Sequence, residues 1–234
     1  MDLTKFIDSS LEHDATRTFL EAIEFRVART RKELEAAYHL VYQEYLRRGY
    51  TDENDAQMRL TIFNALPETT TFIAHIDEFM LATATLIPDS PLGLPMNEIY
   101  LDEINGLRNQ NKKIGEATML ASNTKLFRKG TSMMLNSKKM FLLLFLFRLI
   151  FDYAKSELAL DNICITINPK HNLIYDFLLF ENLGELKPSR QVKGAPAIAK
   201  TLDITNVIAR CRKQGKPGME KMFFRRKVDP PAYT

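Results

Sequence analysis

The sequence predicts a mixed α/β domain, in which a central sheet is flanked by helices. Short runs that are apolar, or that alternate apolar with polar residues as strands do, interchange with longer stretches whose apolar residues recur at helical spacing. This order, with a hydrophobic content of 45% over 234 residues, is typical of a chain that buries a sizeable core. We expect the middle strands of the sheet to be buried.

The first half of the chain is predicted to hold one strand, two helices and a hairpin. Residues 1–20 show only weak periodicity and are interpreted as an N-terminal extension. Thr30 and Glu33 predict a capping box, because the hydroxyl can bind a first-turn amide while the carboxylate reaches back. The expected elements are a strand at 23–28, a helix after Thr30, a second helix at 54–65, and a hairpin of strands 70–76 and 79–87.

The second half alternates strands with helices. A loop at 88–95 leads to a short helix at 97–110 and to a strand within 112–123. The later elements are a long helix at 137–158, strands at 162–169 and 196–204, and a helix at 171–180 between those strands. Residues 21–206 are therefore expected to form one domain, and 207–234 a basic C-terminal segment.

Missing motifs disfavour several functional classes. The chain has no Walker loop, no G-x-G-x-x-G loop and no nucleophile elbow, which argues against nucleotide enzymes with a phosphate cradle and against elbow-type hydrolases. Two cysteines and four histidines stand in no ligand-like spacing, so neither a metal site nor a disulfide scaffold is expected. We expect no nucleic-acid partner.

The sequence also predicts a soluble, cytoplasmic protein. Its first residues are too polar for a signal peptide. The longest apolar run, residues 140–151, has 12 residues and includes Arg148. A membrane-spanning helix needs about 20 apolar residues, so this run is interpreted as a buried core helix.

Positive charge is concentrated near the C-terminus. Residues 207–227 carry eight basic side chains and one acidic side chain, a local charge of +7, so the rest of the chain carries −4 of the total of +3. Such a distribution favours an acidic partner. The alternative is a basic tail that is merely solvated.

The stretch KKIGEATMLASN, residues 112–123, places a lone carboxylate in a strand that is otherwise a core strand. Strand alternation predicts that Glu116 shares its face with Ile114 and Leu120. Burying a carboxylate is costly unless it is paired or has a function. The alternatives are a working acid or base and a structural Glu that is satisfied by backbone amides or by Lys112 and Lys113.

Several segments resemble known acyltransferases. INPKHNLIYDFLLF resembles the last conserved block of the GNAT acyltransferases, in which an Asn ends a strand and a Tyr and a Phe follow. These positions are Asn168, Tyr175 and Phe180, and Leu179 stands where that superfamily usually has Gly. Six blocks between about residues 25 and 205 are similar to one branch, the FeeM-like long-chain N-acyl amino acid synthases, which are relatives of the acyl-homoserine lactone (autoinducer) synthases. The blocks are AYHLVYQEYLRRGY, ALPETTTFIA, PDSPLGLPMNEIYLDEINGLR, IGEATMLA, NPKHNLIYDFLLFENLGE and GAPAIAKTLDI.

The resemblance implies a GNAT fold and a reaction. A long-chain acyl group would move from an acyl carrier protein thioester to the α-amine of an amino acid. No cofactor is implied beyond the acyl-phosphopantetheine arm that the carrier brings as co-substrate, and the lipid product would allow peripheral contact with a membrane. The GNAT pyrophosphate loop is absent after the Glu116 strand, where TKLFRKGTSMML stands, as fits a donor without adenosine pyrophosphate.

One departure from the branch concerns the amino acid substrate. Relatives commonly have a Ser-Arg pair after the Glu, whereas this chain reads Glu116-Ala117-Thr118-Met119. If that arginine holds the substrate carboxylate in relatives, another arginine must replace it here, and the candidates are Arg31, Arg47, Arg48 and Arg59. The residues assigned to substrate binding are Thr118, Met119, Asn168, Phe180 and Arg48.

The catalytic roles follow from the chemistry of amide formation. Glu116 would accept the amine proton, and its apolar strand face should raise its pKa and make it a better base. Backbone amides of the same strand, splayed from the next strand as in GNAT relatives, would bind the oxyanion. Tyr175 is the candidate acid for the leaving thiolate and His171 a second acid or base, although a tyrosine or histidine in a helix is also an ordinary structural residue.

Two further expectations concern the acyl donor. An apolar slot for the chain would be lined by Phe141, Leu142, Phe145, Phe147, Leu149 and residues 177–180, which would look the same in a plain core. The acidic carrier would dock on Arg210, Arg212, Lys213, Arg225 and Arg226.

Three alternatives to the synthase remain at this stage. An acyl-homoserine lactone synthase would use S-adenosylmethionine. An acyl-CoA acetyltransferase is disfavoured by the missing pyrophosphate loop. A non-catalytic acyl-binding protein on the same scaffold is kept open by the Met119 departure.

Overall fold

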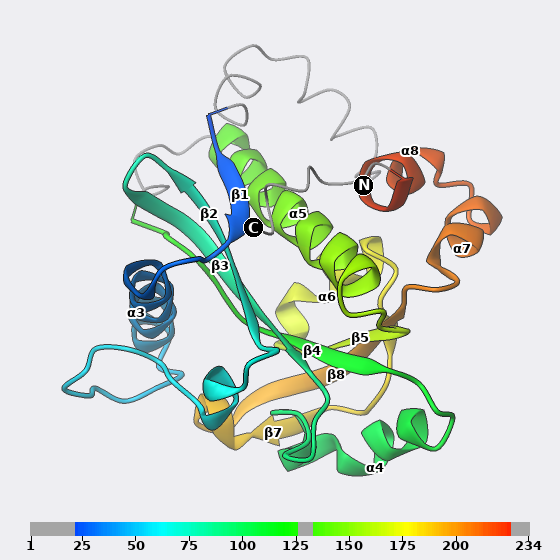
Figure 1. Cartoon of the computed structure of the whole chain (residues 1–234), viewed down its shortest axis with the longest axis horizontal. Coiled ribbons are helices and arrows are strands. Elements are labelled where there is room, and N and C mark those ends of the chain that lie inside the picture. Colours follow the sequence, from blue (N-terminus) through cyan, green and yellow to red (C-terminus); the bar gives the residue numbers. More distant parts are fainter. Residues whose placement is uncertain (1–21, 126–132, 226–234) are drawn as a thin grey trace.

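The computed structural model describes residues 22–125 and 133–225, with the side chains at 133–139, 222, 224 and 225 left out. These residues form a twisted mixed sheet with helices on both faces (Figure 1). The strands are β1 (Glu24–Val27), β2 (Thr70–Ile76), β3 (Phe79–Pro88), β4 (Ile114–Ser122), β5 (Asn162–Ile167), β6 (Glu181–Asn182), β7 (Lys187–Ser189) and β8 (Ala195–Asp203). Their order is β1-β2-β3-β4-β5-β8-β6, with β7 also paired to β8. Only the β4–β5 pair is parallel within this described sheet.

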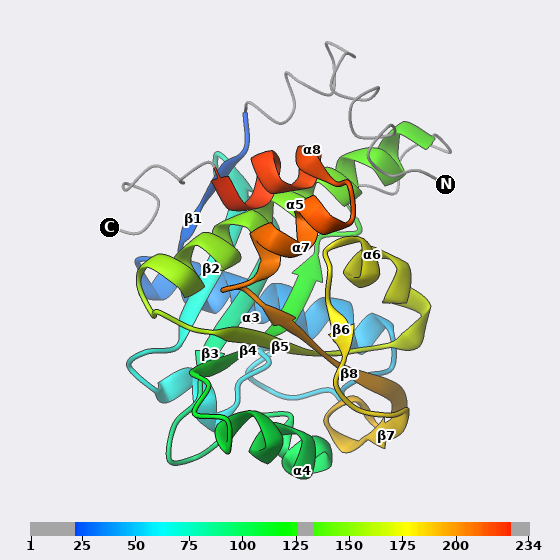
Figure 2. The same ribbon diagram turned by 90° about the vertical axis from the view of Figure 1, so that its right-hand side faces the viewer.

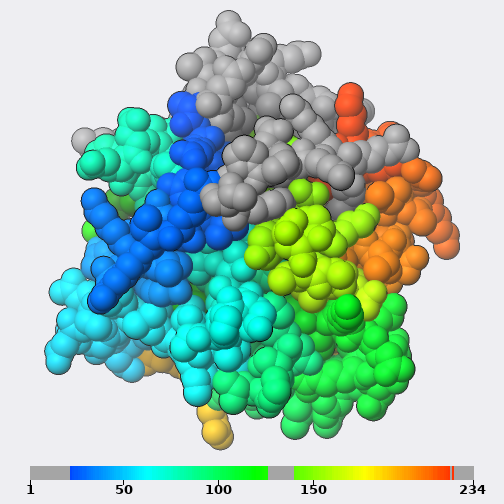
Figure 3. All heavy atoms as spheres, in the orientation of Figure 1, coloured from blue at the N-terminus to red at the C-terminus, as the bar shows by residue number. Residues whose placement is uncertain are grey.

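Helices cover the two faces of the sheet unequally (Figures 1 and 2). One face carries α5 (Met133–Ser156), α6 (Asn172–Phe177), α7 (Val207–Lys213) and α8 (Pro217–Met219), whereas the other carries α3 (Arg31–Arg47) and α4 (Asn97–Arg108). Short elements are the 3-10 helices Ile62–Ala65, Pro169–His171 and Arg190–Val192 and a π-helix at Glu220–Arg225. Figure 3 shows one face of the molecule, with β1 and α3 (blue) on its left side and α4 (green) at its lower right. Across the described ranges, no helix has the length and apolar composition that crossing a membrane requires.

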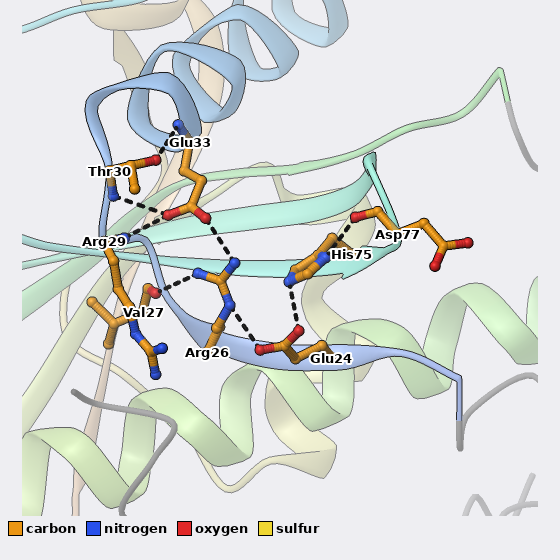
Figure 4. A network of polar contacts seen from close by, with 8 residues as sticks. All are labelled: Glu24, Arg26, Val27, Arg29, Thr30, Glu33, His75 and Asp77. Carbon is orange, nitrogen blue, oxygen red and sulfur yellow. Dashed lines mark hydrogen bonds and ion pairs between the residues drawn. The ribbon is translucent and has the colours of Figure 1, made fainter.

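The predicted capping box at the start of α3 is present (Figure 4). The Thr30 hydroxyl accepts from the Glu33 amide at 3.2 Å, and the Glu33 carboxylate accepts from the Thr30 amide at 3.0 Å. Arg26 of β1 donates to the same carboxylate at 2.7 Å and lowers the pKa of Glu33 to about 2. The helix start is therefore fixed to the edge strand of the sheet.

Strands β4 and β5 separate part-way along their length. They pair at only three positions, the last being Glu116 with Cys164, although β4 continues to Ser122 and β5 to Ile167. Beyond that pair, their facing backbone edges are not bonded to each other. The expected splay of the strand that holds Glu116 is therefore present.

A β-bulge in β4 changes the predicted alternation. Met119 has a φ of +53°, and the register with β3 shifts between Thr83 and Thr85. Consequently Met119 packs against α3 on the other side from Ala117, and Leu120 packs with the α5 side. The prediction that Leu120 shares the face of Glu116 was wrong, because a bulge inserts one extra residue into the strand.

The predicted helix at 54–65 was also wrong, and only its last part forms a 3-10 helix. Gln57 has a φ of +49°, which a helix does not allow. The Asn54 side chain bonds both the amide and the carbonyl of Met58, so a local side-chain interaction replaces the helical ladder. The short strands β6 and β7 were not predicted, and the helix predicted at 171–180 ends at Phe177.

The first part of the basic segment packs onto the domain. Val207, Cys211, Met219 and Phe223 are buried in the main core cluster beside α5. Figure 2 shows α7 and α8 lying over α5. Residues 207–223 are therefore attached to the body of the protein through apolar contacts.

Candidate active site

A cavity of about 500 Å³ lies where β4 and β5 diverge. Its walls come from the separated parts of both strands, from α5 and α6, from the C-terminal end of α3, and from the chain between β7 and β8. Its volume falls within the range of roughly 300–1,000 Å³ that small-molecule sites occupy. Glu116, Thr118, Met119, Asn168, His171, Tyr175 and Arg48 all line it.

Glu116 is a buried carboxyl in the wall of this cavity. It is 1% exposed, and one oxygen accepts a hydrogen bond from the Met96 amide, at the start of α4, at 2.7 Å. Among the described residues no cation pairs with it, which removes Lys112 and Lys113 as structural partners. Desolvation raises the pKa of Glu116 to about 8, and the Met96 amide opposes this shift. Glu116 is thus a carboxyl that releases its proton near neutral pH.

Tyr175 of α6 also lines this wall of the cavity and is held by aromatic contacts. Its ring meets Phe147 and Phe180 edge-on, at centroid distances of 5.6 and 5.8 Å. Burial raises the pKa of the Tyr175 phenol, so it stays a protonated donor over the physiological range. Phe180, predicted to bind substrate, is a core residue behind this wall and is outside the cavity lining.

Asn168 and His171 frame the junction between β5 and α6. The Asn168 side chain accepts from the Lys170 amide at 3.2 Å and donates to the Tyr50 hydroxyl at 3.4 Å. His171 precedes the first residue of α6 and is exposed. Both residues therefore border the cavity, Asn168 as a cap and His171 at the solvent side.

Thr118 and Met119 lie at the bulge. The left-handed backbone of Met119 is a strained conformation for a residue other than glycine, and such strain often marks functional sites. The Met119 sulfur accepts a hydrogen bond from the side-chain amide (Nδ2) of Asn64 at 3.7 Å. Met119 is therefore packed in place and brings no charge to the cavity.

The four candidate arginines fall into two groups, two that line the cavity and two that do not. Arg48 and Arg59 line the cavity, whereas Arg31 pairs with Glu35 at the surface and Arg47 pairs with Glu44. Arg31 and Arg47 are outside the lining. Of the four candidates, Arg48 and Arg59 are therefore the two that a substrate anion in this cavity could meet.

The apolar wall differs from the predicted slot. Of the residues proposed for it, only Phe147 lines the cavity, and Phe141, Leu142 and Leu149 are packed in the core. Met140, Leu143, Leu173 and Ile174 supply the remaining apolar surface of α5 and α6. The prediction named the correct helix but the wrong face, because α5 is apolar nearly all round.

A family model and one structure identify the protein class. The model of the N-acyl amino acid synthase FeeM matches residues 36–203. The chain belongs to this family. The FeeM-family resemblance expected from the sequence is thereby confirmed, as is its assignment as an acyltransferase enzyme. Among curated proteins, none matches the chain in sequence.

Solved structures share the fold of this FeeM-family chain. The structure of FeeM, an N-acyl amino acid synthase from uncultured soil microbes, has 28% identity and a TM-score of 0.66, covering 82% of this chain and 98% of that one. The CoA-dependent acyl-homoserine lactone synthase MesI has 14% identity and a TM-score of 0.56, covering 88% and 97%. An N-acetyltransferase from Staphylococcus aureus Mu50 has 14% identity and a TM-score of 0.52, covering 79% and 99%. The predicted GNAT fold is confirmed.

The departure at Leu179 has a backbone explanation. Leu179 has a φ of +66°, a conformation that glycine adopts without steric cost. Here the Leu179 side chain is buried in the core. This FeeM-family chain therefore forms a left-handed turn after α6 without a glycine.

The residues predicted to dock a carrier are only partly available. Arg210 pairs with Glu181 at 2.8 Å and donates to the Leu179 carbonyl, and Arg212 pairs with Glu220 at 2.9 Å. Lys213 is exposed. The Arg225 side chain and Arg226 lie outside the described residues.

The cavity residues that were not identified from the sequence include Tyr45, Thr166 and Gln191. Tyr45 of α3 was interpreted only as part of an apolar stripe, and Gln191 lies in an unpredicted 3-10 helix. Thr166 of β5 has a buried hydroxyl without a hydrogen-bond partner in the described part of the chain. Thr166 could have been noticed from the sequence, because it is a polar residue near the end of an otherwise apolar strand.

Proposed function

We propose that this FeeM-family acyltransferase is an N-acyl amino acid synthase that uses an acyl carrier protein. It transfers a long-chain fatty acyl group from the carrier thioester to the α-amine of an amino acid. The observation that carries the proposal is the buried, uncompensated Glu116 at the point where β4 and β5 separate, in one cavity with Tyr175. The similarity to FeeM, whose structure is described as that of an N-acyl amino acid synthase, supports the same reaction.

The reaction forms one bond and breaks another. The amine nitrogen attacks the thioester carbonyl, a C–N bond replaces the C–S bond, and the thiolate leaves. An ammonium that becomes an amide releases two protons, of which the thiolate takes one. The site must therefore accept protons from the amine and return one to sulfur.

Glu116 suits the first of these tasks. A carboxylate with a raised pKa is a stronger base than an exposed one, and it meets an α-amine that titrates near 8. A substrate ammonium beside Glu116 would stabilise the ionised carboxylate. Tyr175, a protonated phenol in the same cavity, is the donor we assign to the thiolate.

The separated strands suit the remaining tasks. Backbone amides on the free edge of β4 can bind the oxyanion, because they have no partner in β5 beyond the Glu116–Cys164 pair. The same gap can admit a pantetheine arm. Met140, Leu143 and Phe147 of α5 offer apolar surface for the acyl chain.

Product analysis tests the proposal. Purified protein is incubated with hexadecanoyl acyl carrier protein and the twenty common amino acids, and the lipids are identified by mass spectrometry. We expect N-hexadecanoyl amino acids, faster than with hexadecanoyl-CoA. A lactone formed only when S-adenosylmethionine is added, or no acylated amine with either donor, would contradict the proposal.

A further inference from the structure

Arg59 is a cation in the cavity wall whose charge has no carboxylate partner among residues 22–125 and 133–225. Its Nη2 donates to the Gln191 carbonyl at 2.8 Å, and its guanidinium carbon lies 4.8 Å from the centroid of the Tyr45 ring. Arg59 forms no ion pair with any acidic side chain in these ranges. A guanidinium has five N–H donors, so most of its donors remain available.

The Arg59 side chain is held in position before any substrate binds. The Arg59 amide donates to the Tyr38 carbonyl at 3.1 Å, which fixes the loop against α3. Gln191, which binds the guanidinium through its carbonyl, uses its own side chain to donate to the Pro95 carbonyl. Stacking on Tyr45 adds a planar support. A fixed planar fork of donors is the arrangement that binds a carboxylate with two parallel hydrogen bonds.

The other cations of the cavity are less suited to this task. Arg48 has Glu44 at 3.5 Å, and Glu44 is itself buried and bonded to Thr124. Lys170 is exposed and donates to the Tyr50 hydroxyl at 3.3 Å. Of these three cations, Arg59 alone combines a half-buried position with the absence of a carboxylate partner in the described ranges.

We infer that Arg59 binds the α-carboxylate of the acceptor amino acid. The inference rests on the proposed function and adds the acceptor class: a free amino acid that presents an amine to Glu116 and a carboxylate to Arg59. A cavity that holds one buried carboxyl and one unpaired guanidinium matches a zwitterion. Amines and amino acid amides, which lack the anion, would be poor acceptors.

The unaltered protein provides the first test. Each of the twenty common amino acids is compared with its α-carboxamide as acceptor, with hexadecanoyl acyl carrier protein as donor. Loss of a charge-assisted hydrogen-bonded pair should lower kcat/KM for the carboxamide roughly 10- to 100-fold. Equal use of both acceptors would overturn the role of Arg59 and leave the synthase reaction standing. Acylation of neither would reject the proposed function itself.

Variants locate the effect. In Arg59→Gln, KM for the amino acid should rise roughly 10- to 100-fold while kinetics with the carboxamide stay nearly constant, so that the preference disappears. Arg31→Gln removes an exposed arginine outside the cavity and should keep the wild-type preference. Arg59→Lys keeps the positive charge but lacks the planar guanidinium, so it should recover part of the preference for the amino acid over its carboxamide. Thermal unfolding checks that each variant is folded. A preference that survives in Arg59→Gln, or that is lost instead in Arg48→Gln or Lys170→Gln, would overturn the inference.

Discussion

Glu116 is buried at a cost that the protein does not offset with a counter-charge. One backbone amide binds one of its oxygens, and the other oxygen has no hydrogen-bond donor in the described ranges. A leucine or glutamine would pack at such a position with less penalty. We therefore infer that this carboxyl is present because it accepts and carries a proton in the reaction.

Glu116→Gln tests that explanation through the reaction rate. The amide keeps the shape and can still accept from Met96, but it cannot take a proton. We expect kcat to fall by about 10² to 10⁴ with little change in fold. Steady-state turnover and circular dichroism are the measurements. Wild-type turnover by a folded Glu116→Gln protein would show that another group is the base.

The same substitution has an effect on stability that depends on pH. The pKa of Glu116 is about 8 in the folded state against an ordinary value near 4.5, so the folded state binds more protons between these values. The wild type should therefore lose stability relative to Glu116→Gln as pH rises from about 4.5 to 8, by up to about 1.4 kcal/mol per pH unit. Urea unfolding of both proteins across this range measures the difference. A constant difference would mean that Glu116 is already ionised in the fold.

Tyr175→Phe should have a smaller effect than the loss of Glu116. Water can also protonate a thiolate, and the phenylalanine ring keeps the contacts with Phe147 and Phe180. We expect a decrease in kcat of roughly tenfold or less, below the range for general acid–base groups. A decrease as large as that of Glu116→Gln would make Tyr175 the leading catalytic group.

At the level of elements, the sequence predicted most strands and helices but not the deviations that shape the cavity. The regular alternation in β4 gave no sign of the bulge, because the positive φ of Met119 depends on its packing against β3 and α3. The polar run after α3 has helical propensity, yet the side chain of Asn54 closes a local turn. Tertiary contacts outweigh weak propensities in both cases.

The candidate site was predictable where one residue stands out from its own element. Glu116 is a charge in a core strand, and Tyr175 falls within a recognisable block. The sequence named Arg59 as one of four candidates for the substrate carboxylate but could not single it out, because its partner carbonyl belongs to Gln191, 132 residues further along the chain. The residues of the apolar cavity wall could not be predicted either, because the sequence of α5 does not distinguish the face that lines the cavity from the faces that pack in the core.

The helices after residue 206 provide a prediction about the donor. Lys213 and Lys221 are exposed there, whereas Arg210 and Arg212 are already in ion pairs. If an acidic carrier docks on this surface, Lys213→Glu with Lys221→Glu should raise KM for acyl carrier protein several-fold, through slower association that depends on salt. A short acyl-pantetheine donor should be unaffected.

A charge-matched variant controls this experiment. Lys32→Glu with Lys155→Glu makes the same change in net charge at exposed positions outside the basic segment. It should leave KM for the carrier close to that of the wild type. Equal effects of the two double variants would mean that net charge, rather than a docking surface, governs the interaction.

At the scale of the whole molecule, the candidate cavity is lined from both faces of one sheet. Helices α5 and α6 supply apolar surface and Tyr175 from one face, whereas α3 and the loop after it supply Tyr45, Arg48 and Arg59 from the other. The gap between β4 and β5 joins the two sides at Glu116. An apolar donor and a charged acceptor can therefore approach the same point from different directions.

The stoichiometry of the reaction tests this account most directly. Hexadecanoyl acyl carrier protein is mixed with the enzyme and an excess of amino acids, and the free thiol and the N-acyl amino acid are quantified in the same samples. The account predicts one amide formed for each thiol released, and formation of both products about 10²- to 10⁴-fold slower with Glu116→Gln. Thiol release without amide would identify a thioesterase, and carrier that stays acylated would identify an acyl-binding protein. Either result would contradict the assignment of Glu116 as the base of an amide-forming transferase.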